Sequence, residues 1–204
     1  MKLIREILYR VQIKSIIGDT SLSINNIGFD SRLVSNSDVY IAIKGENTDG
    51  HDFIFQAIEK GAKCIICEIL PTKIISEIVY VLVQCSRKAL GIISSNYYEN
   101  PSSKLNLIGI TGTNGKTTIS TLLYNLYTNL GIKSGLISTV KICIGDKSFK
   151  SRQTTPDPIK INHYLSKMAD NNVRYCFMEV SSHGIDQNRI EGLNFKAGVF
   201  TNLS

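Results

Sequence analysis

The sequence lacks a long apolar run, a signal-peptide core, an internal repeat and any low-complexity tract. No apolar stretch approaches the roughly twenty residues that a membrane-spanning helix requires. The N-terminal run MKLIRE is interrupted by charge, which excludes a secretory signal peptide. Charged residues make up 20% of the chain and hydrophobic residues 43%, which excludes wholesale disorder. We therefore expect a soluble, cytoplasmic, globular protein with no membrane partner.

The sequence also lacks an even, closely spaced set of cysteines. Its five cysteines are spread along the chain, which favours reduced thiols. Cys64 and Cys67 have the spacing of metal ligands or of a redox pair, but they lie in the apolar run of residues 62–70. No second pair of Cys or His is placed to complete a tetrahedral site. We interpret Cys64 and Cys67 as buried strand thiols.

Clusters of basic residues are absent, although basic residues outnumber acidic ones. The chain has 23 Lys and Arg against 17 Asp and Glu, a net charge of +6 and a pI near 9.0. One interpretation is a solvated, lysine-rich surface, and another is attraction to polyanionic small molecules such as ATP and nucleotide sugars. Because the lysines are scattered and no recognition module is present, we expect no nucleic-acid partner.

The most informative segment is G-I-T-G-T-N-G-K-T-T, residues 109–118. It follows a strand-like apolar segment, residues 105–110, and precedes leucines at helical spacing, which are Leu122, Leu123, Leu126 and Leu130. Glycines let the backbone wrap a phosphate, and amides at a helix start point at the anion. The usual phosphate-loop spacing would place a further glycine at Ile110. We predict a nucleoside-triphosphate site in which Lys116 reaches the terminal phosphates and Thr117 ligates Mg²⁺.

Hydrophobic periodicity divides the chain into two predicted α/β units, residues 1–100 and 101–204. The boundary lies at Asn-Pro-Ser-Ser, residues 100–103, a cluster of structure breakers. In the first unit we predict helices at residues 3–11, 53–61 and 89–98, and strands at residues 39–43, 64–69 and 78–83.

Strands and helices alternate in the second unit as a mostly parallel sheet requires. We predict strands at residues 105–110, 133–139, 173–180 and 197–201, helices at residues 116–130 and 158–170, and a hairpin within residues 140–151. Thr139, Glu179 and Asn202 fall at carboxyl ends of strands, where ligand-binding groups gather in such sheets.

A polar segment follows the strand that ends at Glu179. A carboxylate at the end of a buried strand beside the phosphate loop can hold Mg²⁺, while a solvent-exposed glutamate is the alternative. The segment continues with Ser181, Ser182, His183, Gln187 and Arg189. The pair Ser182-His183 suggests a hydrolase, but no nucleophile elbow with flanking glycines surrounds it. We interpret the segment as a polar pocket for an anionic substrate.

The loop Q-T-T-P-D-P, residues 153–158, opens a predicted helix. Its two hydroxyls and the helix N-terminus suit an anion. A simple helix cap at Thr155 or Asp157 explains the same residues equally well.

Taken together, the motifs resemble those of the Mur ligase family. They are TGTNGKTT at residues 111–118, TTPDP at 154–158 and MEVSSHG at 178–184. In the first unit, Asp30-Ser31-Arg32, residues 39–45 and Asp49-Gly50-His51 are similar to the family's uridine-binding domain. Thr201-Asn202-Leu203-Ser204 is similar to a strand end of its central ATPase domain. Folylpolyglutamate synthetases share the phosphate-loop type, but the other motifs favour a Mur ligase.

The resemblance implies a role for each matched residue. ATP would be held by Gly112, Thr113, Asn114, Gly115, Lys116, Thr117 and Thr118, with Lys116 and Glu179 catalytic. Mg²⁺ would be placed by Thr117 and Glu179. The uridine diphosphate portion of the substrate would contact Ser31, Glu46, Asn47 and Thr48. Its muramyl-dipeptide portion would be held by Gln153, Thr154, Thr155, Ser181, Gln187 and Arg189.

The implied activity is ATP-dependent amide ligation in peptidoglycan precursor synthesis. ATP phosphorylates the D-glutamate side chain of UDP-N-acetylmuramoyl-L-Ala-D-Glu, and the amine of diaminopimelate or lysine then displaces phosphate from the acyl phosphate. Positioning and charge neutralisation suffice for such chemistry. The family pattern continues past residue 204 with a carbamylated lysine and an amino-acid-binding domain. We therefore expect a truncated, incomplete central domain and a monomer that forms no product alone. The alternatives are a non-catalytic remnant that binds nucleotide or UDP-sugar and a folate-type glutamate ligase.

Overall fold

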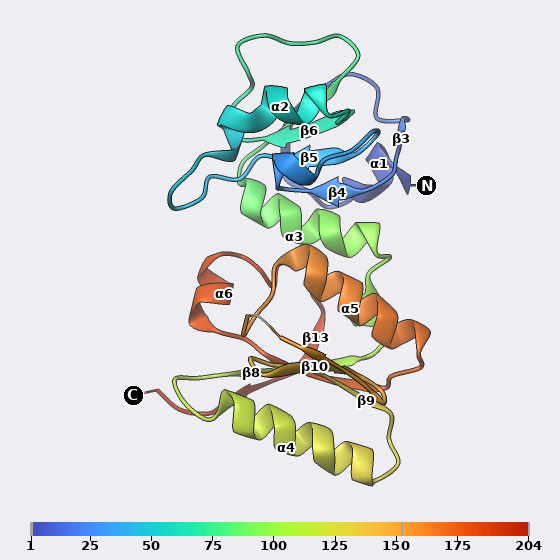
Figure 1. Ribbon diagram of the computed structural model, residues 1–204, viewed down its shortest axis with the longest axis vertical. Helices are drawn as coiled ribbons and strands as arrows, with labels where there is room; N and C mark the ends of the chain where they lie inside the picture. The colour runs from blue at the N-terminus through green and yellow to red at the C-terminus, as the bar shows by residue number, and fades with distance from the viewer. Residues whose placement is uncertain (1, 152, 204) are drawn as a thin grey trace. The chain divides into compact units, whose positions relative to one another are not determined.

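The computed structural model describes residues 2–151 and 153–203. The chain divides into two compact units, Met1–Tyr97 and Tyr98–Ser204 (Figure 1). From the sequence we predicted the boundary after residue 100, three residues beyond the observed one. Ser204, the last residue of the predicted strand-end motif, lies outside the described residues.

The first unit is built on a five-stranded sheet with the order β2-β7-β6-β5-β4. Its strands are β2 (Ile13–Ile17), β4 (Ile27–Gly28), β5 (Val39–Ile41), β6 (Cys64–Cys67) and β7 (Val79–Val83). Strands β4 to β7 pair in parallel, and β2 pairs antiparallel with β7. Every residue of β5 and β6 is buried, as in parallel sheets covered on both faces.

Short helices and turns complete the first unit. They are α1 (Ile4–Ile7), α2 (Ile54–Glu59), α3 (Ser86–Tyr97), and the 3₁₀ turns η1 (Ser31–Leu33) and η2 (Gly50–Phe53). A separate pair joins β1 (Lys2–Leu3) to β3 (Ser23–Ile24).

Besides the unpredicted two-residue strands β1, β3 and β4, two features of this unit differ from the sequence prediction. The helix predicted at residues 3–11 is wrong in extent, because Leu3 pairs in β1 and the helix is a single turn that ends before Leu8. Arg10 then has a φ of 64°, which a continuing helix does not allow. Strand β2 was not predicted, because four of its five residues are exposed and its sequence lacks apolar alternation.

The second unit contains a six-stranded sheet with the order β11-β10-β9-β12-β8-β13. Its strands are β8 (Asn106–Thr111), β9 (Ser134–Ile137), β10 (Lys141–Ile144), β11 (Lys147–Lys150), β12 (Tyr175–Glu179) and β13 (Phe195–Phe200). Strands β9, β12, β8 and β13 are parallel, and β10 and β11 form the predicted antiparallel hairpin. The predicted mostly parallel sheet is thus confirmed.

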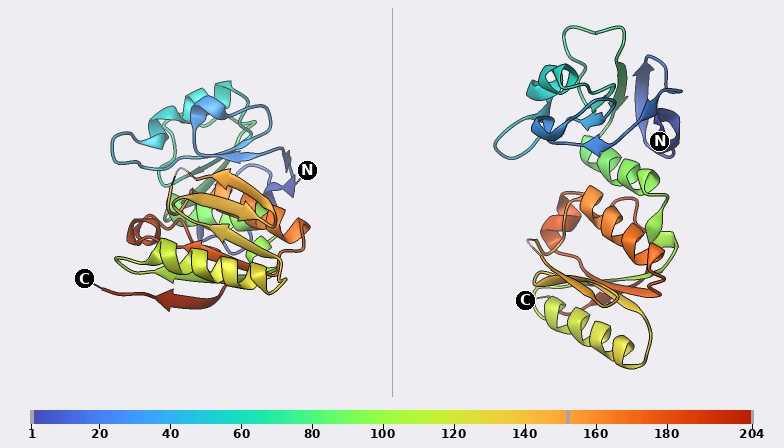
Figure 2. Two further views of the ribbon diagram at one scale, coloured as in Figure 1. Left: turned by 60° about the horizontal axis from the view of Figure 1, so that its bottom comes forward. Right: turned by 45° about the vertical axis from the view of Figure 1, so that its right-hand side comes forward.

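Helices cover both faces of this sheet. Helix α4 (Lys116–Asn129) lies on one face, and α5 (Pro158–Asp170) and α6 (Ser182–Asp186) lie on the other, as the views in Figures 1 and 2 show. A 3₁₀ turn, η3 (Pro101–Ser103), precedes β8. Helix α6 was not predicted, because its short polar sequence carries no apolar periodicity.

Helix α4 packs through a different face from the one its leucines suggest. Leu122, Leu126 and Leu130 are more than half exposed, at 61%, 52% and 66%. The residues that pack against the sheet core are Ile119, Leu123, Tyr124 and Tyr127. Aromatic rings therefore share this contact with Leu123, and the ring centroids of Tyr127 and Phe177 are 5.1 Å apart.

The cysteines are all free thiols, and four of the five are buried. Burial raises the pKa of Cys67 to about 11 and also raises that of Cys64. The prediction of buried strand thiols is confirmed. Within the part of the chain that the structure describes, no helix has the length and apolar character to cross a membrane.

Candidate functional site

The predicted phosphate loop lies between the end of β8 and the start of α4. Gly112 and Gly115 have φ angles of +134° and +84°, which L side chains rarely adopt, so glycine is required at both turns. Ile110 occupies the place of the usual further glycine and is fully buried in the sheet. Gly109 stays in the strand, where an added Cβ would lie 3.0 Å from the Phe195 ring. At the position where the usual spacing has a glycine, this chain therefore has a buried strand residue.

Lys116 folds over this loop from the first position of α4. Its Nζ donates to the carbonyl oxygens of Gly112 at 2.7 Å and Thr113 at 2.9 Å. The first amides of a helix have no intrahelical acceptor, and the helix dipole makes that end positive. The loop thus places an ammonium group beside the amides that begin α4, which is the chemistry of a phosphate site.

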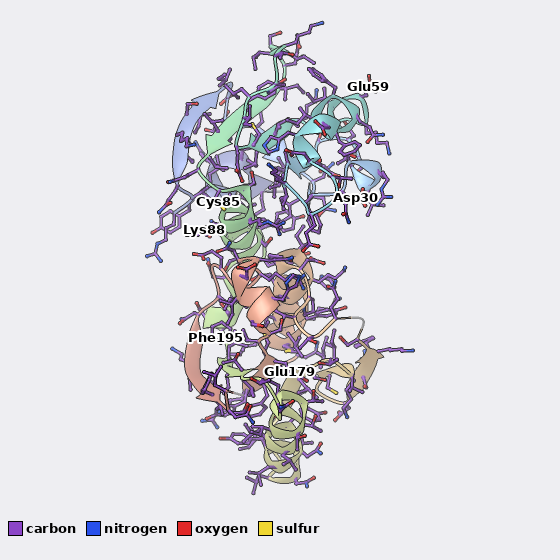
Figure 3. All side chains as sticks on the ribbon, turned by 90° about the vertical axis from the view of Figure 1, so that its left-hand side faces the viewer. Asp30, Glu59, Cys85, Lys88, Glu179 and Phe195 are labelled. Carbon is purple, nitrogen blue, oxygen red and sulfur yellow. The ribbon has the colours of Figure 1, made fainter. Side chains whose placement is uncertain are left out.

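Glu179 ends β12 and is fully buried next to the start of α4 (Figure 3). Its Oε2 accepts hydrogen bonds from the hydroxyls of Thr117 at 3.1 Å and Thr139 at 2.9 Å. Its Oε1 accepts the Thr139 amide at 3.1 Å. The alternative of a solvent-exposed glutamate is wrong. Parallel strands β9 and β12 end at the same edge of the sheet, which brings these residues to the phosphate loop.

A hydroxyl cluster extends from Glu179 to the loop before α5. The Thr139 and Thr154 hydroxyls are 3.0 Å apart. Thr155 is buried, and its hydroxyl donates to the Glu179 main-chain oxygen at 3.1 Å and accepts the Ser181 amide at 3.0 Å. Thr154, Thr155 and Ser181, predicted from separate motifs, therefore lie in one site.

Helix α6 and the turn after it carry the remaining predicted side chains of this site. The Arg189 guanidinium donates to the Thr155 carbonyl at 2.7 Å and to Gln187 Oε1 at 2.7 and 3.0 Å. The side-chain amide nitrogen of Gln187 is 2.8 Å from His183 Nε2. His183 therefore has a structural partner in Gln187, and its presence does not require a catalytic pair with Ser182. An added Cβ at Gly184 would lie 2.9 Å from the Thr155 Cβ, so the glycine lets α6 approach closely.

The donor set at Thr117 and Glu179 fits Mg²⁺. A hydroxyl and a carboxylate supply oxygen ligands, and Mg²⁺ usually completes its shell with water and phosphate oxygens. The described residues contain no group of three or more His, Cys, Asp or Glu that could hold a metal by itself.

The other predicted residues of the second unit lie at the surface of the site region. Thr113, Asn114, Gly115 and Thr118 of the phosphate loop are exposed. Gln153 is also exposed, and its carbonyl accepts the Ser151 hydroxyl at 2.8 Å.

The predicted uridine contacts belong to the first unit. Ser31 is buried in η1, and its hydroxyl donates to Gln56 Oε1 at 2.6 Å. Asp30 caps η1 by accepting the Arg32 amide, and hydrogen bonds from the Arg32 side chain lower the pKa of Asp30. Burial, followed by the charges of Asp30 and Asp49, raises the pKa of Tyr40 to about 12, so its hydroxyl stays a donor to the Gly50 carbonyl.

Glu46, Asn47 and Thr48 form an exposed turn that is closed by the Gly45 amide on the Thr48 carbonyl at 2.9 Å. The structure thus places them in a different unit from the Glu179 cluster.

The base of this turn is fixed by His51, which sequence analysis mentioned only as part of a motif. His51 Nδ1 is 2.6 Å from Asp49 Oδ1, and His51 Nε2 accepts the Glu68 amide at 2.9 Å. Glu68 Oε1 in turn accepts the Ser86 amide at 2.7 Å. These contacts require a neutral imidazole with its proton on Nδ1. Backbone and side-chain hydrogen bonds from His51 lower the pKa of Asp49.

Comparison with known proteins gives consistent matches in both units. A model of the Mur ligase middle domain matches residues 110–204, and a model of the Mur ligase family catalytic domain matches residues 23–98. The UDP-N-acetylmuramoyl-L-alanyl-D-glutamate–2,6-diaminopimelate ligases of Phocaeicola vulgatus and Bacteroides fragilis are 48% and 49% identical over 204 residues. The alignments cover 100% of this chain and 42% of each relative, so the chain spans less than half of their length.

Solved structures give the same result for the fold. A diaminopimelate ligase of the same name has a TM-score of 0.79 at 23% identity, over 100% of this chain and 40% of that one. MurF ligase from Thermotoga maritima in complex with ADP has a TM-score of 0.56 at 25% identity, over 87% of this chain and 37% of that one. The phosphate loop, the buried Glu179 cluster and the matches in both units agree, and the chain belongs to the Mur ligase family through its N-terminal and middle domains.

Proposed function

We propose that this chain forms the nucleotide-binding and UDP-substrate-binding parts of an ATP-dependent ligase. The ligase would join diaminopimelate to UDP-N-acetylmuramoyl-L-Ala-D-Glu in peptidoglycan precursor synthesis. The identity of 48% over the whole chain to ligases of that name supports the choice of substrate and amino acid. The observation that carries the proposal is the fully buried Glu179, bonded to Thr117 beside the phosphate loop and joined through Thr139 to Thr154.

In the proposed reaction, this chain positions reactants and neutralises charge. Lys116 and the first amides of α4 hold the ATP phosphates and offset the charge that develops on the transferred phosphoryl group. Thr154, Thr155, Ser181, Gln187 and Arg189, with Gln153 beside them, hold the muramyl-dipeptide so that its D-glutamate carboxylate faces ATP. Transfer gives an acyl phosphate, which the incoming amine converts to the amide with release of phosphate.

Thr117 and Glu179 are the residues that would hold Mg²⁺, which when bound shields the phosphate oxygens. The carboxylate is kept in place by Thr139, whose amide and hydroxyl both bond to it. Gly112 to Thr118 form the rest of the nucleotide site.

The first unit would bind the uridine diphosphate end of the substrate. Ser31 presents a side chain already fixed by Gln56. The exposed turn of Glu46, Asn47 and Thr48, held at its base by His51, would supply the other contacts. We further propose that the protein acts in the cytoplasm as a monomer.

Isothermal titration calorimetry on this chain tests the proposal. We expect separate, saturable binding of ATP with Mg²⁺ and of UDP-N-acetylmuramoyl-L-Ala-D-Glu, and no binding of a folate-type polyglutamate substrate. Millimolar or weaker affinity for the muramyl-dipeptide, with ATP binding intact, would contradict the substrate assignment. Loss of both ligands would contradict the proposed function as a whole.

A further inference from the structure

The end of β13 contacts the phosphate loop at several points that the proposed function does not use. The Asn202 main-chain oxygen accepts the Thr113 amide at 3.0 Å, and Asn202 Oδ1 accepts the Asn114 amide at 3.0 Å. The Thr201 hydroxyl donates to the Asn114 carbonyl at 2.6 Å. These partners are 87 to 89 residues apart in sequence, so this part of the loop is shaped by a neighbouring strand.

Asn202 and Lys116 act on the same two peptide groups. The peptide between Gly112 and Thr113 donates its N–H to Asn202 and accepts Lys116 Nζ on its carbonyl. The next peptide, between Thr113 and Asn114, donates its N–H to Asn202 Oδ1, and its carbonyl accepts a hydrogen bond from Lys116 Nζ. In a trans peptide the N–H and the C=O point in opposite directions. Fixing the two N–H groups on Asn202 therefore turns both carbonyls toward Lys116.

The fit between strand end and loop leaves no room for a side chain at Gly112. A Cβ added to Gly112 would collide with the Thr201 hydroxyl oxygen and would lie 2.9 Å from the Asn202 main-chain oxygen. The Thr201 amide also bonds to the Thr111 carbonyl at 2.9 Å, which extends the β8–β13 pairing up to the loop. With Ile110 in place of a glycine, the loop obtains its shape from Gly112, Gly115 and this contact.

We propose that Asn202, with Thr201, is a positioning residue of the nucleotide site. It orients the two peptides that hold Lys116, and it engages the amides of Thr113 and Asn114. The phosphates are consequently left to Lys116 and to the first amides of α4. This inference rests on the proposed binding of ATP. It predicts that a substitution at the end of β13 weakens nucleotide binding although the substituted residue does not contact the nucleotide.

Nucleotide affinity of matched variants tests this role. We expect Asn202→Ala to weaken ATP and ADP binding about tenfold, as loss of a single well-placed hydrogen bond does. Thr201→Val, which removes only the hydroxyl, should weaken binding several-fold, and Thr201→Ser should restore it. Asn106→Ala is the control, because it removes an asparagine contact to the Arg174 carbonyl at the opposite end of β8. Binding of the UDP-substrate should stay at the wild-type level in all four variants.

A spectroscopic measurement separates positioning from general destabilisation. In ¹H–¹⁵N spectra of nucleotide-free protein, Asn202→Ala should shift the amide signals of Thr113 and Asn114 while the β9 and β12 signals stay in place. If wild-type protein binds ATP and the Asn202→Ala and Thr201→Val variants bind it equally well, this inference is wrong and the proposed function stands. Wild-type protein that binds no ATP would overturn the proposed function and this inference with it.

Discussion

The two units hold their candidate ligand-binding residues in contrasting ways. In the second unit, Glu179, four threonine hydroxyls and Ser181 are linked by hydrogen bonds at the edge of a parallel sheet. In the first unit, Ser31 is buried, while Glu46, Asn47 and Thr48 lie on an exposed turn whose base is held by His51. Phosphoryl transfer demands precise positions, whereas recognition of a nucleotide-sugar tolerates a turn that adjusts on binding. The difference predicts that substitutions in the two units affect separate ligands.

The largest expected effect comes from Lys116→Ala. Removing a charged donor to phosphate should weaken ATP binding by about two orders of magnitude, since hydrogen bonds to charged groups contribute about 1.5–3 kcal/mol. The fold should persist, because the side chain contacts only loop carbonyls. Calorimetry with ATP and with UDP-substrate checks this, and Lys147→Ala on exposed β11 is the control. Equal loss of both ligands would contradict the separation of the two sites.

Glu179→Gln should remove the Mg²⁺ dependence of nucleotide binding. The amide keeps the shape of the carboxylate but loses its charge, and it places an N–H₂ group against donors such as Thr117 and Thr139. We expect ATP affinity with Mg²⁺ to fall about tenfold or more, toward the value without Mg²⁺, and stability to fall by about 1–3 kcal/mol. Titrations with Mg²⁺ and with EDTA measure the first effect, and thermal unfolding measures the second. If the ratio of the ATP affinity with Mg²⁺ to that without Mg²⁺ is the same as in the wild type, Glu179 does not bind the metal.

Ser31→Ala tests the first unit in the same way. Loss of one neutral hydrogen bond, together with the freed Gln56, should weaken the UDP-substrate about five- to tenfold and leave ATP binding unchanged. Ser76→Ala is the matched control, because that hydroxyl bonds only to the neighbouring Glu77 on the surface. Identical binding of UDP-substrate by Ser31→Ala and wild type would refute the uridine assignment.

The smallest expected effect is the response of the exposed turn to acid. Because the pKa of Asp49 is lowered in the folded state, its contribution to stability is present above the ordinary value of 3.8 and is lost as pH falls through the lowered pKa. The effect should stay below about 1 kcal/mol, because the carboxylate is partly exposed. Hydrogen exchange of the amides at residues 45–51 should accelerate in that acid range. The acceleration should be absent in Asp49→Asn.

The sequence predicted those parts of the site that depend on local spacing. The phosphate loop, Lys116 and Thr117 follow from glycines between a strand and a helix. Glu179 follows from the end of an apolar strand, whereas Thr154 and Thr155 were assigned to the substrate through the family resemblance.

The parts that depend on distant contacts were not predictable. The link from Asn202 to Asn114 spans 88 residues, and sequence spacing carries no sign of it. The packing face of α4 was missed because Tyr124 and Tyr127, rather than the leucines alone, fill the space against the sheet. The roles of His51 and Thr139 likewise depend on partners brought in by the fold.

The uneven burial of the thiols has a practical consequence. Cys64, Cys67, Cys143 and Cys176 are buried, and Cys85, which is labelled in Figure 3, alone among the five is partly accessible. A maleimide dye should therefore label the native protein at Cys85 without prior mutagenesis. Because Cys85 precedes Ser86, which is joined through Glu68 to His51, the dye would sit beside the hydrogen bonds that hold the base of the turn of residues 46–48.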